Sequence, residues 1–196
     1  MWRARHNFPV FRFVAATLTA FLVAPVSTLY SAQNTGVALD GTAADPFKKS
    51  PGKIVVLVFV RTDCPISNRY APRIQQISAK YDGKATFWLV YPDKSESAEK
   101  IRRHEREYKY GLPALRDPQH TLVKLAQARV TPEVAVFDAT RRLTYHGRID
   151  DLYQDLGRAR QAPTTHELED AIQAGLDGHA PPTSAPGVGC FISDLE

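Results

Sequence analysis

Acidic side chains are absent from the first 32 residues of this 196-residue chain, although the whole sequence contains 21 of them. Arg3, Arg5 and Arg12 lie in that segment and supply three of the four units of formal net charge. The rest of the chain is therefore nearly neutral. This distribution gives no support to a nucleic-acid partner, which a basic patch on the folded domain would indicate.

The segment without acids resembles an export leader. Residues 1–12 are basic, and residues 13–26 are apolar apart from two threonines, as in the n-region and h-region of a secretory signal. Ala32 suits the last position before cleavage, whereas Tyr30 is too large for the small residue expected two positions earlier. We therefore expect residues 1–32 to be a signal peptide or an uncleaved membrane anchor. The protein is then exported to the periplasm or another extracytoplasmic space, and touches a membrane only through an uncleaved leader.

Cysteine is also scarce, since only Cys64 and Cys190 occur. In an exported protein, two cysteines so far apart fit a static disulfide that pins the C-terminal tail, two unrelated thiols, or a redox pair. Position 67 is Ser67, so the chain lacks a Cys-x-x-Cys motif at Cys64. Any redox cycle at Cys64 needs a one-cysteine mechanism or a distant partner.

The histidines lack the i,i+4 and other spacings of metal ligands, so we expect no designed metal site and no cofactor. Outside the leader they are His104, His120, His146, His166 and His179. We expect each of them at the surface or in a loop. His146 is the best candidate for a base near Cys64.

An unbroken apolar run at residues 54–60 predicts a central strand buried on both faces. The run stops shortly before Cys64 and Pro65. Proline is favoured in the first turn of a helix, where its missing N–H would have no partner. Cys64 is therefore expected beside the free N–H groups of a helix N-terminus, which favour a thiolate.

The rest of the chain predicts an α/β domain with a mixed sheet over residues 53–178. Helices are expected at about 67–81, 96–110, 119–128 and 164–178, and strands at about 54–60, 85–91, 130–138 and 143–149. Residues 33–52 are interpreted as an irregular lead-in with room for a short strand, and residues 151–163 as a polar loop. Residues 179–196 form a Pro/Gly-rich tail that carries Cys190.

Two helix starts carry capping signals. Asp93 and Glu96 have the spacing of a capping box, and Thr164 or Thr165 can cap the last helix. The Thr131–Pro132 bond, at the entry to a strand, is a candidate cis peptide.

Five segments together resemble the thioredoxin-fold redoxins described as peroxiredoxin-like and related to the AhpC/TSA domain. They are TDCPISNRY (62–70), LRDP (115–118), VTPE (130–133), GRIDD (147–151) and GCFI (189–192). The resemblance implies a three-layer α/β/α fold with a central mixed sheet. It also implies that Thr131 and Pro132 pack beside Cys64, and it makes Thr62, Pro65 and Ser67 candidates for substrate binding.

The sequence lacks the residues that orient and polarise a peroxide in members of this family. The proline and threonine of the peroxiredoxin motif fall on Leu57 and Arg61, with Thr62 one position off, and the strand-preceding arginine is missing near Pro132. Efficient peroxidase activity of the usual kind is therefore not expected. Ser67, one turn into the helix, is either a donor to the Cys64 sulfur or an ordinary helix residue.

We interpret the chain as an exported thiol-disulfide oxidoreductase in which Cys64 attacks and Cys190 resolves. Its partners would be a protein or small-molecule thiol, disulfide or peroxide, with an external thiol as reductant. One alternative is an antioxidant thiol peroxidase that uses the same cysteines. Another is a non-enzymatic redox or metal-binding module that uses Cys64, Cys190 and a histidine.

Overall fold

The computed structural model describes residues 1–2 and 35–195. The predicted leader, residues 1–32, lies almost entirely outside the described residues. Within the described part, no helix is both long and apolar enough to cross a membrane.

The domain is built on a seven-stranded mixed sheet with the order β2-β1-β5-β4-β3-β7-β8. Its centre is β3 (Ile54–Phe59), in which every residue is buried, as the apolar run predicts. β3 pairs in parallel with β4 (Ala85–Tyr91) and antiparallel with β7 (Glu133–Phe137). The edge beyond β7 is β8 (Leu143–Gly147), which returns from a hairpin turn. The C-terminal end of β3 leads directly toward Cys64.

Helices cover both faces of this sheet. They are α1 (Pro65–Lys80), α2 (Ala98–Tyr108), α3 (Thr121–Ala126) and α4 (Glu167–Asp177). Val56 and Val58 pack into one apolar cluster with residues of α1, α2 and α4, whereas Val55 and Leu57 pack into a second cluster with α3. Successive residues of a strand point to opposite faces, so one apolar run supplies both clusters. The predicted three-layer α/β/α fold is confirmed.

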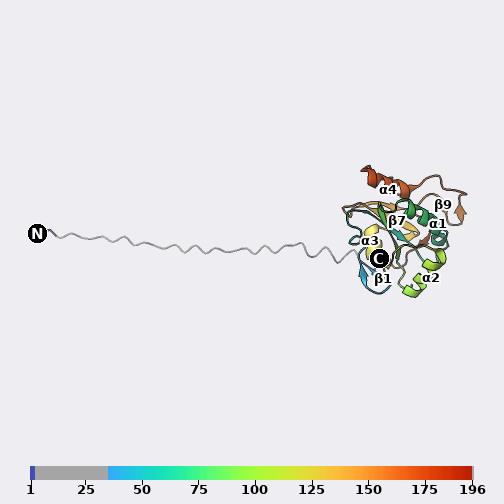
Figure 1. The fold of residues 1–196 in the computed structure, drawn as a ribbon, viewed down its shortest axis with the longest axis horizontal. Coiled ribbons are helices and arrows are strands. Elements are labelled where there is room, and N and C mark those ends of the chain that lie inside the picture. The colour runs from blue at the N-terminus through green and yellow to red at the C-terminus, as the bar shows by residue number, and fades with distance from the viewer. Residues whose placement is uncertain (3–34, 196) are drawn as a thin grey trace. The chain divides into compact units, whose positions relative to one another are not determined.

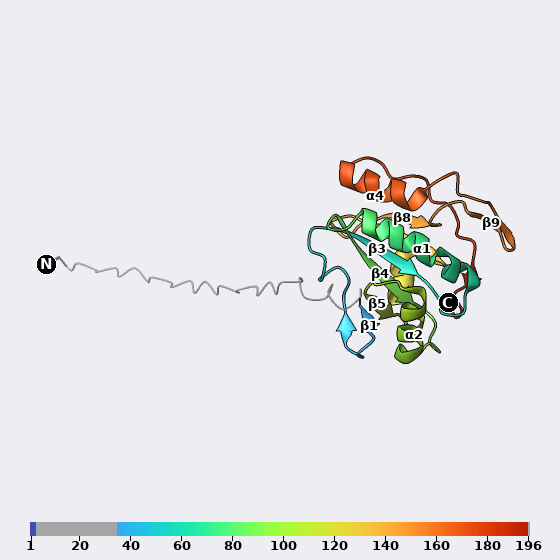
Figure 2. The ribbon, with the colours of Figure 1, turned by 45° about the vertical axis from the view of Figure 1, so that its right-hand side comes forward.

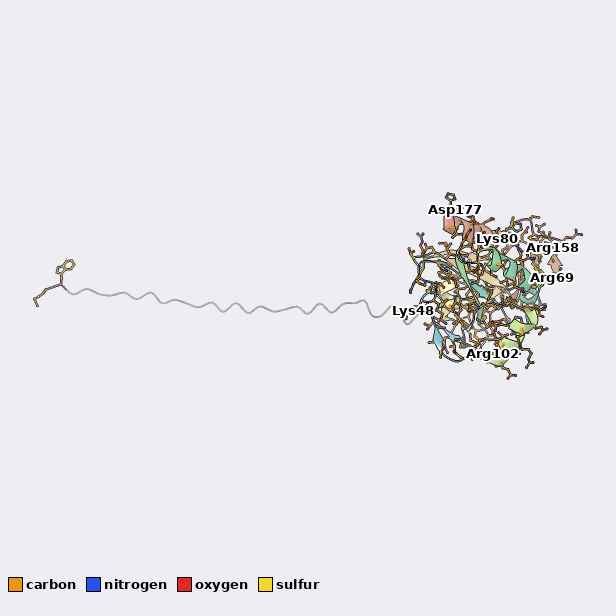
Figure 3. The ribbon with its side chains drawn as sticks, viewed as in Figure 1. Lys48, Arg69, Lys80, Arg102, Arg158 and Asp177 are labelled. Carbon is orange, nitrogen blue, oxygen red and sulfur yellow. The ribbon has the colours of Figure 1, made fainter. Side chains whose placement is uncertain are left out.

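The helices α1 and α4 lie side by side over the same face (Figures 1 and 2). Arg73 and Lys80 of α1 both form ion pairs with Glu169 of α4. Other charged side chains, including Arg69 and Arg102, project from the surface of the domain (Figure 3).

Several short strands go beyond those expected from the sequence. The lead-in, where one short strand was expected, supplies two, β1 (Gly36–Ala38) and β2 (Ala43–Ala44), which extend the sheet beyond the unpredicted β5 (Ala114–Arg116). The loop at residues 151–163 contains a hairpin of β9 (Tyr153–Asp155) and β10 (Arg158–Ala159). Each has only two or three residues, too few to show a period in the sequence.

Both predicted caps were wrong. The N-cap of α2 is Ser97, whose hydroxyl accepts from the backbone N–H of Lys100. α4 starts after His166, with no side-chain cap, because Thr164 and Thr165 donate instead to Asp151. Those bonds tie the segment before α4 to the base of the β9–β10 hairpin.

Candidate active site

Cys64 lies where β3 and its following turn meet α1. It is the N-cap residue of the helix, and Pro65 occupies the first turn, as predicted. The Cys64 side chain is fully buried, and its Sγ lies 3.0 Å from the carbonyl oxygen of Thr131. The sulfur is therefore placed at a helix N-terminus but is not open to solvent.

The segment that faces Cys64 is the turn between β6 (Val130–Thr131) and β7. The Thr131–Pro132 peptide is cis, as the sequence suggested, and both residues are buried. The Glu133 carboxylate accepts hydrogen bonds from the backbone N–H groups of Arg129 and Val130. A buried side chain thus holds this turn against the thiol.

Cys190 approaches the same turn from the tail. It begins β11 (Cys190–Phe191), which pairs antiparallel with β6 so that Cys190 lies opposite Thr131. The Thr131 hydroxyl donates to the Cys190 carbonyl at 3.4 Å, and the Ile192 N–H donates to the Arg129 carbonyl at 3.0 Å. Both cysteines are free thiols, and both lie at Thr131.

The Pro/Gly-rich tail is docked on the domain. A Cβ added to Gly189 would lie 2.0 Å from the Thr131 carbonyl oxygen, and one added to Gly147 would lie 2.2 Å from the Ala185 carbonyl oxygen. The Arg148 N–H donates to that same Ala185 carbonyl at 2.9 Å. The tail and the domain approach so closely here that a side chain would not fit at either glycine.

The two thiols titrate together. Burial raises the pKa of Cys64, but the neighbouring Cys190 and Ser67 outweigh this and leave the pKa below its usual value. The contact with the Thr131 carbonyl favours the protonated form only slightly, because a thiol is a weak donor. Burial and the neighbouring Cys64 raise the pKa of Cys190 to about 12. Cys64 is thus the thiol of the pair that ionises first, and Cys190 keeps its proton.

The three candidate substrate-binding residues are not equivalent. Ser67 is buried near Cys64, so the structure brings these two residues together. Pro65 is exposed beside the buried thiol. Thr62 is turned away, because both its N–H and its hydroxyl donate to Oε1 of Glu96, at 2.8 Å and 2.5 Å.

Glu96 and His104 are buried, although both were read from the sequence as polar surface or capping residues. Asn68 connects His104 to the segment that carries Thr62. Its amide donates to the Thr62 carbonyl, and its Oδ1 lies 2.8 Å from Nε2 of His104. The Tyr91 hydroxyl lies 2.9 Å from Nδ1 of the same ring. A neutral imidazole that donates from Nε2 and accepts at Nδ1 fits this pattern, and burial lowers the pKa of His104 to about 4.

The expectation that every histidine lies at the surface or in a loop was therefore wrong for His104, which is buried on α2, whereas His120 lies in the loop before α3, although it too is buried. A signal for His104 was present, since it lies three residues after the buried Ile101 on the same helix face. His146 faces Ala135 from β8 and lines a separate cavity of about 280 Å³ with the tail residues 184–186. Within the described residues, no hydrogen bond joins His146 to Cys64.

Arg61 connects the turn before Cys64 (residues 61–64, the Cys64 turn) to the tail. Its guanidinium donates to the Phe191 carbonyl at 3.3 Å and forms ion pairs with Asp63 at 3.1 Å and Asp93 at 3.3 Å. Across residues 1–2 and 35–195, no group of three His, Cys, Asp or Glu side chains is arranged to hold a metal ion.

Comparison with known proteins gives a family match: the family described as AhpC/TSA matches residues 37–146. No match was found among curated proteins. Two similar solved structures are a hypothetical protein from Sinorhizobium meliloti and an uncharacterized conserved protein from Geobacillus kaustophilus. The first is 23% identical with a TM-score of 0.68 and covers 81% of this chain and 88% of its own. The second is 22% identical with a TM-score of 0.70 and covers 81% and 86%.

A third similar structure is a secreted disulfide oxidoreductase from Mycobacterium tuberculosis. It is 18% identical with a TM-score of 0.51, and covers 74% of this chain and 96% of its own. At such identities the three structures support the fold alone.

Proposed function

The chain belongs to the AhpC/TSA family of thioredoxin-fold redoxins, and from this premise we propose that it is a thiol-disulfide oxidoreductase that uses Cys64 and Cys190. The observation that carries the proposal is the meeting of the two free thiols at Thr131, with the pKa of Cys64 lowered and that of Cys190 raised. Cys64 is therefore the attacking thiol, and Cys190 stays protonated until the second step.

In the proposed first step, the Cys64 thiolate attacks a substrate disulfide. A bond forms between the Cys64 sulfur and one substrate sulfur, the substrate S–S bond breaks, and the second substrate sulfur leaves as a thiolate. The Cys64 sulfur is buried under β11, so the tail must withdraw before the substrate can reach it. The substrate then replaces the tail over the Cys64 sulfur.

In the proposed second step, Cys190 loses its proton to solvent and attacks the Cys64 sulfur of the mixed disulfide. The Cys64–Cys190 bond forms, and the remaining substrate sulfur leaves as a thiolate. The substrate disulfide is thereby reduced to two thiols, and the two protein thiols are oxidised to a disulfide that an external dithiol must reduce. Burial is the main cause of the raised pKa of Cys190; once Cys64 is part of a disulfide it has no charge, so the smaller contribution of Cys64 to that raised pKa is gone.

The test is the reaction of the reduced protein with oxidised glutathione, followed as released glutathione. We expect Cys64→Ser to abolish the reaction and His146→Ala, a histidine of the separate cavity, to leave it unchanged. Cys190→Ser should stop at a stable mixed disulfide detectable by mass spectrometry. Equal turnover without Cys64 would refute the proposal.

The equilibrium with glutathione also gives the reduction potential of the pair. A potential below about −300 mV would identify a structural disulfide, and a higher one supports exchange chemistry.

Peroxide reduction is the second candidate, favoured by the family match. The Cys64 thiolate would attack one peroxide oxygen, so that an S–O bond forms, the O–O bond breaks and the second oxygen leaves as hydroxide, which makes Cys64 a sulfenic acid. The Cys190 sulfur would then attack the Cys64 sulfur, form the disulfide and release water. The Thr62 hydroxyl is engaged by Glu96, so it is not free to orient a peroxide. Stopped-flow consumption of hydrogen peroxide no faster than by free cysteine would remove this candidate.

We also propose that residues 1–32 direct export and that residues 53–178 with the tail form the redox unit. The support is the basic and apolar pattern of the leader. Mass spectrometry of the N-terminus of the mature protein in the extracytoplasmic fraction tests this, and an intact cytoplasmic chain would contradict it.

A further inference from the structure

Arg61 is the side chain of the Cys64 turn that contacts the tail directly. Its guanidinium donates to the Phe191 carbonyl, which belongs to the residue after Cys190. Asp63 and Asp93 flank the guanidinium, and the Arg61 side chain is only 21% exposed. Two carboxylates thus fix the direction in which Arg61 donates, because a guanidinium presents its N–H groups in a rigid plane.

The tail has few other attachments at this point. β11 has two residues, and the Phe191 side chain is 77% exposed, so it does not hold the strand by burial. The described contacts that hold β11 are its pairing with β6, the buried Ile192, the close approach at Gly189 and the bond from Arg61. Among these, Arg61 alone ties the tail to the turn that carries Cys64.

We infer that Arg61 is a positioning residue that holds β11 in the register at which Cys190 faces the Cys64 sulfur. The inference rests on the proposed function of Cys190 as the resolving cysteine. A thiol that attacks a disulfide must approach one chosen sulfur, so the rate depends on how often the strand occupies that register. The positive charge of Arg61 also lowers the pKa of Cys190, against the larger effects that raise it. Both effects favour the second step, whereas holding β11 in place slows the first step, for which the tail must withdraw.

Reaction with 5,5′-dithiobis(2-nitrobenzoate) separates the two steps. Attack by the Cys64 thiolate releases one thionitrobenzoate and leaves a mixed disulfide on Cys64. Attack by the Cys190 thiolate on the Cys64 sulfur then forms the Cys64–Cys190 bond and releases a second thionitrobenzoate. Each release is seen as a rise in absorbance, so the first and second phases give the two rates in one trace.

We expect Arg61→Ala to slow the second phase roughly fivefold, because one charge-assisted hydrogen bond at a partly exposed site is lost. The first phase should become faster, because the tail is away from Cys64 more often, whereas the slowing of the second phase alone identifies the loss of positioning. Arg61→Lys keeps the charge and one donor and should restore part of the rate. The matched control is Lys94→Ala, which removes an exposed ion pair to Asp194 of the same tail and should change neither phase. A wild-type second phase in Arg61→Ala would overturn the inference.

A second measurement tests the positioning role of Arg61 even if Cys190 does not attack the mixed disulfide on Cys64. In a Cys190→Ser background, iodoacetamide alkylates Cys64 only when the tail is away, so adding Arg61→Ala should increase the plateau rate of alkylation roughly fivefold. Absence of a second phase in the wild-type protein would refute the proposed function alone. An unchanged alkylation rate would refute the positioning role of Arg61 alone.

Discussion

Gly189→Ala is expected to release the tail from Cys64 without unfolding the domain. The added methyl group would lie 2.0 Å from the carbonyl oxygen and 2.6 Å from the carbonyl carbon of Thr131. Carbon–oxygen contacts are ordinarily about 3.3 Å or longer, so the tail must retreat by about 1.3 Å. β6 cannot move instead, because its turn is buried and held by Glu133.

The expected increase in the undocked population follows from the contacts that hold the tail on the domain. Burial of Ile192 is worth about 2 kcal/mol, and the hydrogen bonds of the Ile192 N–H and the Cys190 carbonyl about 1 kcal/mol each. Loss of about half of this sum, or about 2 kcal/mol, would raise the undocked population about 30-fold. The free energy of unfolding of the domain should change much less, because α1, α4 and the central sheet are untouched.

The assay is alkylation of Cys64 by iodoacetamide in a Cys190→Ser background, measured by mass spectrometry. We expect a rate about 30-fold above that of the parent. Gly187→Ala should have a smaller effect, because the nearest atom to its new methyl group is a Val130 side-chain methyl at 2.9 Å, which can turn away.

Gly157→Ala is the matched control, since Gly157 has φ +78° but open space around it, and should show no increase. A Gly189→Ala rate equal to the parent's would refute the account of tail docking.

Two further predictions concern ionisation and stability. Ser67→Ala removes a neighbouring hydroxyl that lowers the pKa of Cys64, so the midpoint of the Cys64 alkylation rate against pH should move to higher pH; an unchanged midpoint would show that Ser67 does not stabilise the thiolate. Asp151→Asn should lower the free energy of unfolding by about 1–3 kcal/mol at neutral pH, because Thr164, Thr165 and Arg160 all bond that carboxylate. Those bonds also lower the pKa of Asp151, so its contribution is complete above about pH 4 and is lost as the pH falls further. Urea unfolding at neutral pH and below about pH 4 should show a smaller difference in the free energy of unfolding between variant and wild type at the acid pH.

The central strand and the start of α1 could be predicted from the sequence because each has a local cause. An apolar run of this length needs burial on both faces, and Pro65 fits the first turn of a helix. The pairing of β11 with β6 had no such signal, because a two-residue strand exists only through its partner. Gly187 and Gly189 look in the sequence like flexible linker residues, whereas here they allow close contact with β6 and the cis turn.

The buried polar side chains were missed for a related reason. Glu96 and His104 lie in a stretch that follows the pattern of a charged surface helix, and the loop before Cys64, Asn68 and Tyr91 supply the hydrogen bonds that offset the cost of their burial. The loop and Asn68 are distant in the sequence from these two residues. The helix face that His104 shares with Ile101 indicated its burial, whereas no pattern along the segment indicated the burial of Glu96.

The distance along the chain between Cys64 and Cys190 couples oxidation to folding. A bond between them would close a ring that spans 126 positions, so it would restrict nearly the whole unfolded domain. In the chain-entropy description such a ring stabilises the fold by about 5 kcal/mol. A thermodynamic cycle requires the same free energy to appear in the reduction potential of the pair, as a shift of about 100 mV between the folded and unfolded chain. A substitution far from either sulfur that weakens the reduced and oxidised folds equally leaves the potential of the folded pair unchanged, but it moves the apparent potential toward that of the unfolded chain once the reduced protein unfolds.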